Sequence, residues 1–159
     1  MRLLFWAPFL AASAHIIEEF VFPGGFLAWH RRYRPEHAAS ITARFVLIVN
    51  GLLLFFCVAV GLNGPTPIGV AEWLTVAAIL VTNAAFHIRA VVSTCVYSPG
   101  VVTAVCLYVP LCVAGYYWFL HTGAASIGTV VAAFLLGGSY PFVSALLHRQ
   151  RSERARHQR

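Results

Sequence analysis

Apolar residues form long runs along the chain, and short stretches rich in glycine, proline and polar residues separate these runs. A run of about 20 apolar residues can cross the hydrocarbon core of a bilayer as a helix. Helices are expected because lipid cannot satisfy the hydrogen bonds of a free backbone. The pattern therefore predicts five spans, at residues 3–22, 41–61, 70–92, 101–120 and 127–147.

The composition agrees with a membrane protein. Hydrophobic residues make up 60% of the 159 residues and charged residues only 10%, whereas about a quarter of a soluble domain is charged. A soluble domain of this size could not bury so much apolar surface, which excludes soluble enzymes, disordered chains and nucleic-acid-binding domains. We expect an all-α integral membrane protein with one transmembrane domain of five helices, residues 1–148, and a basic cytoplasmic tail, residues 149–159.

The arginines predict the orientation of the chain in the membrane. All 11 basic residues are arginine, and a five-span arrangement leaves only Arg2 on one side. Positive charge beside membrane spans stays cytoplasmic, so we expect the N-terminus outside and the C-terminus in the cytoplasm. The expected location is the inner membrane of a bacterium, with membrane lipid as a partner. The arginines on the cytoplasmic side are Arg31, Arg32, Arg34, Arg44, Arg89, Arg149, Arg151, Arg154, Arg156 and Arg159.

Two polar patches lie inside the first and third apolar runs. Glu18 and Glu19 follow His15 by three and four residues, so the three side chains share one side of a helix. Asn83 and His87 are four residues apart on the third span, at about the same depth when the helical rise is counted from the outer end. Ionisable groups at membrane depth normally face an interior partner or a wet cavity. We therefore predict that the two patches meet in the cytoplasmic half of the bundle.

Imidazole and carboxylate groups in one site suit a divalent metal ion such as Zn, Fe or Mn. The candidate ligands are His15, Glu18, Glu19 and His87. A dication would also explain how two adjacent carboxylates are tolerated in a low dielectric. The alternative is a buried polar network that fixes helix packing without a metal.

Other polar side chains fall near the same level and are candidates for substrate binding. They are Asn50, Tyr108, Ser139 and Tyr140. Pro110 and Pro141 lie inside predicted spans, where each removes a backbone hydrogen bond and favours a kink.

Residues 23–40 are too polar to span the membrane, and we expect them to lie on its inner surface. Their arginines fit either anchoring to anionic lipid or a clamp for a phosphorylated substrate. The apolar residues here are Phe26, Leu27 and Trp29, and the arginines are Arg31, Arg32 and Arg34.

The sequence His15-Ile16-Ile17-Glu18-Glu19 resembles the signature of the small HXXEE-motif integral membrane proteins, a family without a settled function. His87 and the segment Tyr97-Ser98-Pro99-Gly100 give the resemblance weaker support. The resemblance implies that His15, Glu18 and Glu19 are important, and it supplies no substrate.

These observations lead to one main hypothesis and two alternatives. The main one is a metal-dependent enzyme that hydrolyses, isomerises or cyclises a hydrophobic or lipid-like small molecule by proton transfer. Glu18 or Glu19 would be the acid or base, and Asn83 would orient a ligand or bind the substrate. The alternatives are a carrier or binder of a proton, metal ion or small lipophile, and a structural membrane subunit. The oligomeric state stays open, since Ala133-x-x-x-Gly137 permits close helix contact without demanding a dimer.

Overall fold

The computed structural model describes residues 2–157, and every regular element in this range is a helix. Side chains are described for residues 2–151 and for Glu153, so those of Arg154, Arg156 and Arg159 in the predicted basic tail lie outside the described part. The elements are α1 (Arg2–Phe20), α2 (Phe26–Tyr33), η1 (Pro35–His37), α3 (Ala43–Asn63), α4 (Pro67–Thr94), α5 (Val101–Thr103), η2 (Ala104–Tyr108), α6 (Val109–His121), α7 (Ile127–Gly138) and α8 (Tyr140–His157).

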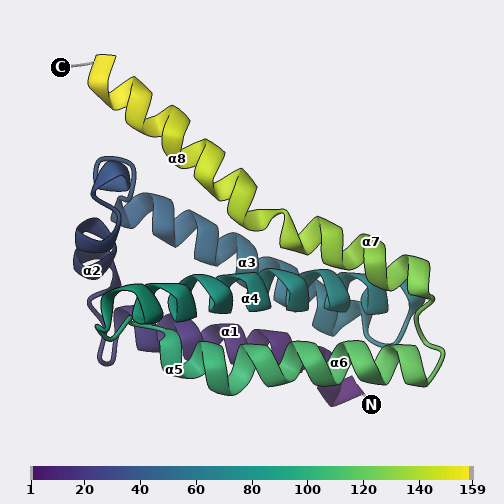
Figure 1. Ribbon diagram of the computed structural model, residues 1–159. Coiled ribbons are helices and arrows are strands. Elements are labelled where there is room, and N and C mark those ends of the chain that lie inside the picture. Colours follow the sequence, from purple (N-terminus) through teal and green to yellow (C-terminus); the bar gives the residue numbers. More distant parts are fainter. Residues whose placement is uncertain (1, 158–159) are drawn as a thin grey trace.

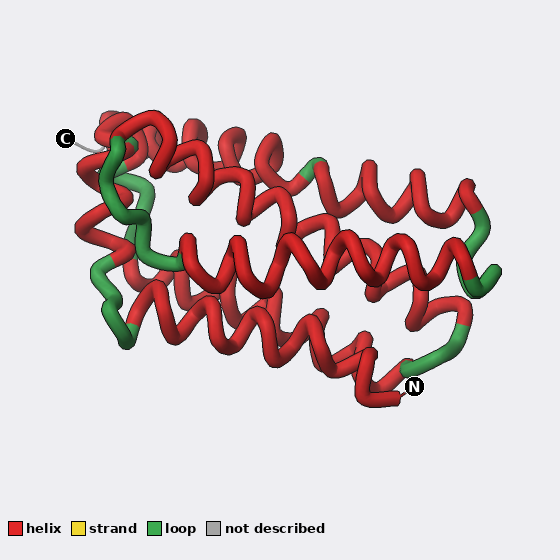
Figure 2. The backbone as a smooth tube through the Cα atoms, turned by 60° about the horizontal axis from the view of Figure 1, so that its bottom comes forward, coloured by secondary structure: helices red, strands yellow, loops and turns green. Residues whose placement is uncertain are grey.

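Within residues 2–157, five helical segments are long and apolar enough to cross a membrane, which confirms the all-helical fold class and the five predicted apolar helices. They are α1, α3, α4, the continuous helix α5–η2–α6, and the α7–α8 segment up to Arg151. The long helices run lengthwise through the molecule, and the longer connections lie at its two ends (Figures 1 and 2). Large apolar side chains such as Leu47 and Phe55 on α3 point outward, as expected for a surface that contacts lipid.

Side-chain caps explain where three of the helices begin. Thr42, Thr66 and Ser126 accept hydrogen bonds from backbone N–H groups three residues later, at the starts of α3, α4 and α7. Helix α4 starts at Pro67, three residues before the predicted span, because proline fits the first helical position and Thr66 caps it.

Helix α4 forms the centre of the bundle and contacts α1, α3, α6 and α7. At one end of the bundle, the fully buried Trp73 on α4 packs against Phe119, and Phe5 packs against the same phenyl ring. The indole nitrogen of Trp73 donates a hydrogen bond to the carbonyl oxygen of Leu4 at 3.0 Å. A Cβ at Gly115 would lie 1.9 Å from the Trp73 ring, so a glycine is needed at this helix crossing.

The small residues Ala133 and Gly137 on α7 are used within the chain. Both are buried, and a Cβ at Gly137 would lie 2.3 Å from the carbonyl oxygen of Thr75 on α4. These two small residues therefore allow α7 to pack closely against α4.

The fifth span differs from the uninterrupted run predicted at 127–147. Helix α7 ends at Gly138, and α8 begins at Tyr140 with Pro141 in its first turn. Proline lacks the N–H that would continue the α7 hydrogen-bond pattern, so the chain restarts a helix there. Helix α8 runs on to His157, through part of the predicted tail, and diverges from α3 and α4 (Figure 1).

The segment predicted to lie on the inner surface folds across one end of the bundle (Figure 1). On α2, His30 is buried and Phe26 and Tyr33 are half-buried, whereas Arg31 and Arg32 are exposed. This spacing of three to four residues gives α2 one face against the bundle and one basic face outward.

Candidate metal centre and adjoining cavity

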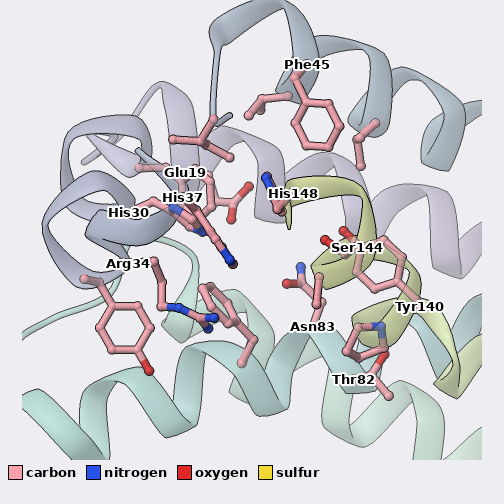
Figure 3. Close-up of a pocket in the computed structure, with 18 of the residues that line it drawn as sticks. Glu19, His30, Arg34, His37, Phe45, Thr82, Asn83, Tyr140, Ser144 and His148 are labelled. Carbon is pink, nitrogen blue, oxygen red and sulfur yellow. The ribbon is translucent and has the colours of Figure 1, made fainter. Parts of the chain in front are cut away.

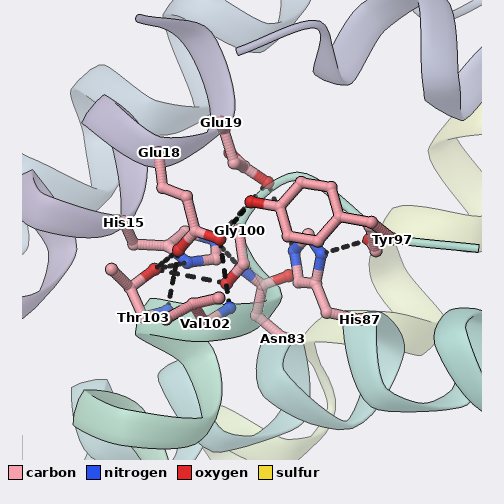
Figure 4. A network of polar contacts seen from close by, with 10 residues as sticks. His15, Glu18, Glu19, Asn83, His87, Tyr97, Gly100, Val102 and Thr103 are labelled. Carbon is pink, nitrogen blue, oxygen red and sulfur yellow. Dashed lines mark hydrogen bonds and ion pairs between the residues drawn. The ribbon is translucent and has the colours of Figure 1, made fainter. Parts of the chain in front are cut away.

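His15 and Glu19 on α1 meet His87 on α4, as the two polar patches predict. Glu19 Oε1 lies 3.4 Å from His15 Nε2 and 3.2 Å from His87 Nε2, and all three side chains are buried (Figure 4). Asn83 joins them, with its Nδ2 3.2 Å from His15 Nε2. Among the described residues, His15, Glu19 and His87 are the one group of three whose donor atoms could hold a metal ion. We call these three residues the triad.

Each imidazole of the triad is oriented by a hydroxyl group that contacts its Nδ1 atom, on the side of the ring away from Glu19. His15 Nδ1 lies 2.9 Å from Thr103 Oγ1, and His87 Nδ1 lies 2.9 Å from Ser98 Oγ. In the tautomer with the proton on Nδ1, each ring donates to its hydroxyl and turns the Nε2 lone pair toward Glu19. Partners of this kind orient histidine ligands in metal sites.

Glu18 lies outside the triad, although it is adjacent to Glu19. Its carboxylate accepts from the backbone N–H groups of Val102 and Thr103 at 3.0 and 2.7 Å, from the Thr103 hydroxyl at 2.5 Å, and from the Tyr97 hydroxyl at 2.6 Å. It therefore caps the N-terminus of the α5–η2–α6 helix, where a negative charge is favoured. Desolvation, together with the bond to Glu18, raises the pKa of Tyr97 to about 12, so Tyr97 stays a donor at neutral pH.

Gly100 packs directly on the triad. Its φ is +99°, and a Cβ there would lie 2.6 Å from His15 Cε1 and 3.0 Å from both Glu19 Cγ and His87 Cε1. Both the left-handed backbone and the lack of space require glycine. The turn at residues 97–100 thus closes the triad, with Ser98 bonded to His87 and Tyr97 bonded to Glu18 beside the triad.

The donor set and spacing of the triad fit a divalent metal. Two imidazole nitrogens and one carboxylate oxygen, each about 2.0–2.2 Å from a tetrahedral ion, would be separated by about 3.3 Å. The observed separations from Glu19 Oε1 are 3.2 and 3.4 Å, and all three donor atoms lie within 4.8 Å of one another. His87 Nε2 is buried, and its contact with Glu19 Oε1 at 3.2 Å is an ion pair without regular hydrogen-bond geometry, so metal coordination would satisfy this nitrogen. Three protein ligands also leave a coordination position open, as in catalytic sites.

A cavity of about 360 Å³ adjoins the triad between α3, α4 and α8, and α2 and η1 close one end of it (Figure 3). Glu19 lines the cavity and links it to the triad. Phe45 and Val49 of α3 and Ala145 of α8 supply apolar wall, and Arg34 and Arg89 also line the space. The cavity is therefore amphipathic and of a size typical of ligand sites.

The structure divides the predicted substrate-binding residues into two groups. Asn50 and Tyr140 line the cavity, as does Asn83. Tyr108, at the end of the π-helical turn η2, does not line the cavity but is fully buried and packs against His15, with ring centroids 4.6 Å apart. Ser139 also lies outside the lining, since its hydroxyl bonds to the carbonyl of Leu136 where α7 ends.

Sequence reasoning missed the contributions of Thr103 and Ser98. Both hydroxyl groups are common in apolar helices and loops, and their spacing carries no signal for a ligand-orienting role. Gly100 was recognisable only as part of the segment Tyr97-Ser98-Pro99-Gly100. The positions of these groups depend on how the loop after α4 folds back over α1, which is a property of the tertiary structure.

Comparison with known proteins now places the chain in a family. The model of the family described as "Protein of unknown function with HXXEE motif" matches residues 6–115, which include all of the triad and its partners. The chain belongs to this family, as the resemblance of the motif implies. No curated protein and no solved structure matches it significantly.

Proposed function

We propose that the protein is a membrane-embedded, metal-dependent enzyme that performs acid–base chemistry on a lipid-like substrate. The observation that carries this proposal is the convergence of His15 Nε2, His87 Nε2 and Glu19 Oε1 beside an amphipathic cavity. A structural network alone does not need an adjoining cavity of ligand size. The reaction class is hydrolysis, isomerisation or cyclisation through proton transfer.

The residues of the site have distinct proposed roles. His15, His87 and Glu19 hold a divalent ion such as Zn, Fe or Mn, and the bound ion would polarise a substrate oxygen as a Lewis acid. Glu19 lines the cavity, so its carboxylate is also the group placed to exchange a proton with the substrate. Asn83 lines the same wall and donates to the substrate. Glu18 is a positioning residue, because its four bonds to the α5 end and Tyr97 hold Thr103 against His15.

The divergence of α8 from α3 supports lateral entry of the substrate from the bilayer. The cavity lies between these two helices, and its apolar lining comes partly from each. A hydrocarbon chain would occupy this gap, while the reacting end approached Glu19. Asn50 and Tyr140 are polar groups on the opposite walls that would contact the bound molecule.

We propose that the end of the bundle formed by α2 faces the cytoplasm, in the inner membrane of a bacterium. Arg31 and Arg32 lie on α2 and Arg34 follows it, and α8, which carries Arg149 and Arg151, ends on the same side of the molecule as α2 (Figure 1). The N-terminus lies toward the opposite end of the bundle (Figure 1). The positive-inside rule supports this orientation.

Metal analysis tests the central proposal. Wild-type protein purified in a mild detergent, without chelators, is expected to contain stoichiometric Zn, Fe or Mn by inductively coupled plasma mass spectrometry. His87→Asn removes one of three ligands and should lose the metal. The matched control is His121→Asn, because His121 is an exposed histidine at the other end of the bundle, stacked on Tyr117.

Thermal unfolding in detergent separates loss of a ligand from loss of the fold. A folded His87→Asn variant without metal supports the metal centre. Wild-type protein that stays metal-free after incubation with each ion would refute it.

The triad can also be explained as a metal-free network that docks α1 on α4. The bond between Asn83 Nδ2 and His15 Nε2 favours this alternative, because it uses a nitrogen that a metal would otherwise take. In that case Glu19→Gln should destabilise the fold strongly in a protein that contains no metal.

A further inference from the structure

A second histidine cluster lies at the α2 end of the cavity, and the metal proposal does not use it. His30, His37 and His148 come from α2, η1 and α8. The His37 and His148 rings stack with centroids 4.9 Å apart, and His30 lies 6.3 and 6.1 Å from them. All three line the cavity, and Figure 3 shows them grouped beside Arg34. We call these three residues the histidine cluster.

The groups around this end of the cavity favour an anion. Arg34 and Arg89 line the same space, and Glu19 is the one carboxylate among the lining residues that the structure describes. Arg34 is ion-paired through Nε with the exposed Glu36, which lies outside the lining, so the terminal amino groups of Arg34 are the donors that would bind a ligand in the cavity. Guanidinium groups bind phosphate oxygens through paired donors, and imidazoles add single donors.

One nitrogen of the histidine cluster is buried and unpartnered. His30 is 6% exposed, and its Nδ1 has no hydrogen-bond partner among the described residues. By contrast, His148 is held by a 2.7 Å bond between its Nδ1 and the hydroxyl of Ser40. A buried nitrogen without a partner is costly, and a ligand oxygen in the cavity would satisfy it.

We propose that the histidine cluster, Arg34 and Arg89 bind the phosphate group of a phosphorylated amphiphile whose hydrocarbon chain extends between α3 and α8. This inference deepens the proposed function and rests on it for the reacting end of the molecule, since it names the class of substrate that the cavity takes. The apolar wall from Phe45, Val49 and Ala145 suits the chain, and the basic end suits the phosphate. Burial has the largest effect on the pKa of His30, and the charges of His148 and His37 add to it, so that this pKa is lowered to about 4. His30 is therefore neutral at pH 7. A phosphate anion bound beside His30 would favour its protonation.

Calorimetric titration with dodecyl phosphate tests this proposal on the full chain in maltoside micelles. Wild-type protein should bind dodecyl phosphate at least about tenfold more tightly than dodecanol, dodecanoate or inorganic phosphate. Only dodecyl phosphate gains binding free energy both from charge-assisted hydrogen bonds to a phosphate group and from burial of a hydrocarbon chain. Equal binding of inorganic phosphate would identify a site for the free ion, and equal binding of dodecanoate a site for any anion. Either result overturns the proposal.

Matched arginine variants locate the phosphate. Arg34→Gln/Arg89→Gln should weaken binding by about tenfold or more, whereas Arg32→Gln, an exposed arginine on the same helix as His30, should not. If the double variant does not fold, the binding test is made with Arg89→Gln alone, because Arg89 is exposed and its replacement leaves the core intact. Equal affinity in Arg89→Gln and Arg32→Gln would overturn the assignment.

The same titration with His87→Asn separates this proposal from the metal centre. Retained binding in that variant supports the basic end as the phosphate site, whether or not wild-type protein contains metal. Binding lost in His87→Asn but kept in the arginine variants would place the phosphate at the triad and overturn the proposal. A wild-type protein that holds metal but does not bind dodecyl phosphate would refute this inference and leave the metal centre standing.

Discussion

The two histidine clusters of this protein are neighbours, since the rings of Phe26, Trp29 and Phe86 contact both His87 and His30, yet they are built for opposite charges. In the triad, two imidazoles turn their Nε2 atoms toward a carboxylate, and hydroxyl groups hold their other nitrogens. In the histidine cluster, three imidazoles pack against one another beside arginine. A carboxylate surrounded by lone pairs favours a cation, whereas adjacent imidazoles and guanidinium groups favour an anion.

The contrast shows how the same residue type acquires different chemistry. Each cluster contains one buried nitrogen that makes no hydrogen bond among the described residues: His87 Nε2, which is ion-paired with Glu19, and His30 Nδ1. Their surroundings, and not their own chemistry, decide which ligand would satisfy them. Substitutions of Gly100 and Thr103 change the surroundings of the triad, and substitution of His30 removes one member of the histidine cluster.

The largest expected effect is that of Gly100→Ala. The new methyl group would overlap His15 and press on Glu19 and His87, in a backbone conformation that alanine disfavours. We expect a loss of about 3 kcal/mol or more in stability, together with loss of bound metal. Thermal unfolding and metal analysis check both. Gly51→Ala is the control, because nothing lies within 4 Å of a Cβ at Gly51, and an equal effect there would contradict the packing argument.

Thr103→Val should have an intermediate effect confined to the triad. It removes the hydroxyl that bonds His15 Nδ1 and the Glu18 carboxylate while keeping the side-chain shape. Loss of such a partner lowers metal affinity by about 10- to 100-fold, which competition with a chromogenic chelator measures. Thr103→Ser restores the hydroxyl and should restore the affinity. An unchanged affinity in the valine variant would show that the hydroxyl does not orient the ligand.

The smallest expected effect is a pH dependence of stability that originates in the histidine cluster. Burial lowers the pKa of His30 to about 4 and also lowers that of His37. The unfolded chain then binds more protons, so stability is highest above the ordinary histidine pKa of about 6.5 and falls as the pH approaches 4. We expect the melting temperature in detergent to drop by roughly 5 °C between pH 7.5 and 5.

His30→Phe identifies the source of this pH dependence. The ring of His30 packs against Phe26 and Phe86, so phenylalanine suits the position and cannot take up a proton. The variant should show a smaller drop, whereas His121→Phe, at an exposed position, should behave as wild type. Equal drops in all three proteins would place the titrating group elsewhere.

The two clusters also differ in how far the sequence predicts them. His15, Glu19, Asn83 and His87 were expected to meet, because helical period and rise are local properties that give the side and depth of each residue. The histidine cluster was not expected. His148 is far from His30 and His37 along the chain, and it reaches them only because α2 folds across the bundle end and α8 diverges after Pro141.

The sequence by itself determined the membrane class, the five apolar helices and the shared depth of the two polar patches. These depend on hydrophobicity, helix length and helical period, which are encoded locally. Only the tertiary structure decided that Glu19 joins the triad while Glu18 caps the α5 end, that Gly100 closes the site, and that the cavity has a basic end. Each of these features depends on which helices become neighbours and how loops return over them, and such contacts form between residues distant in sequence.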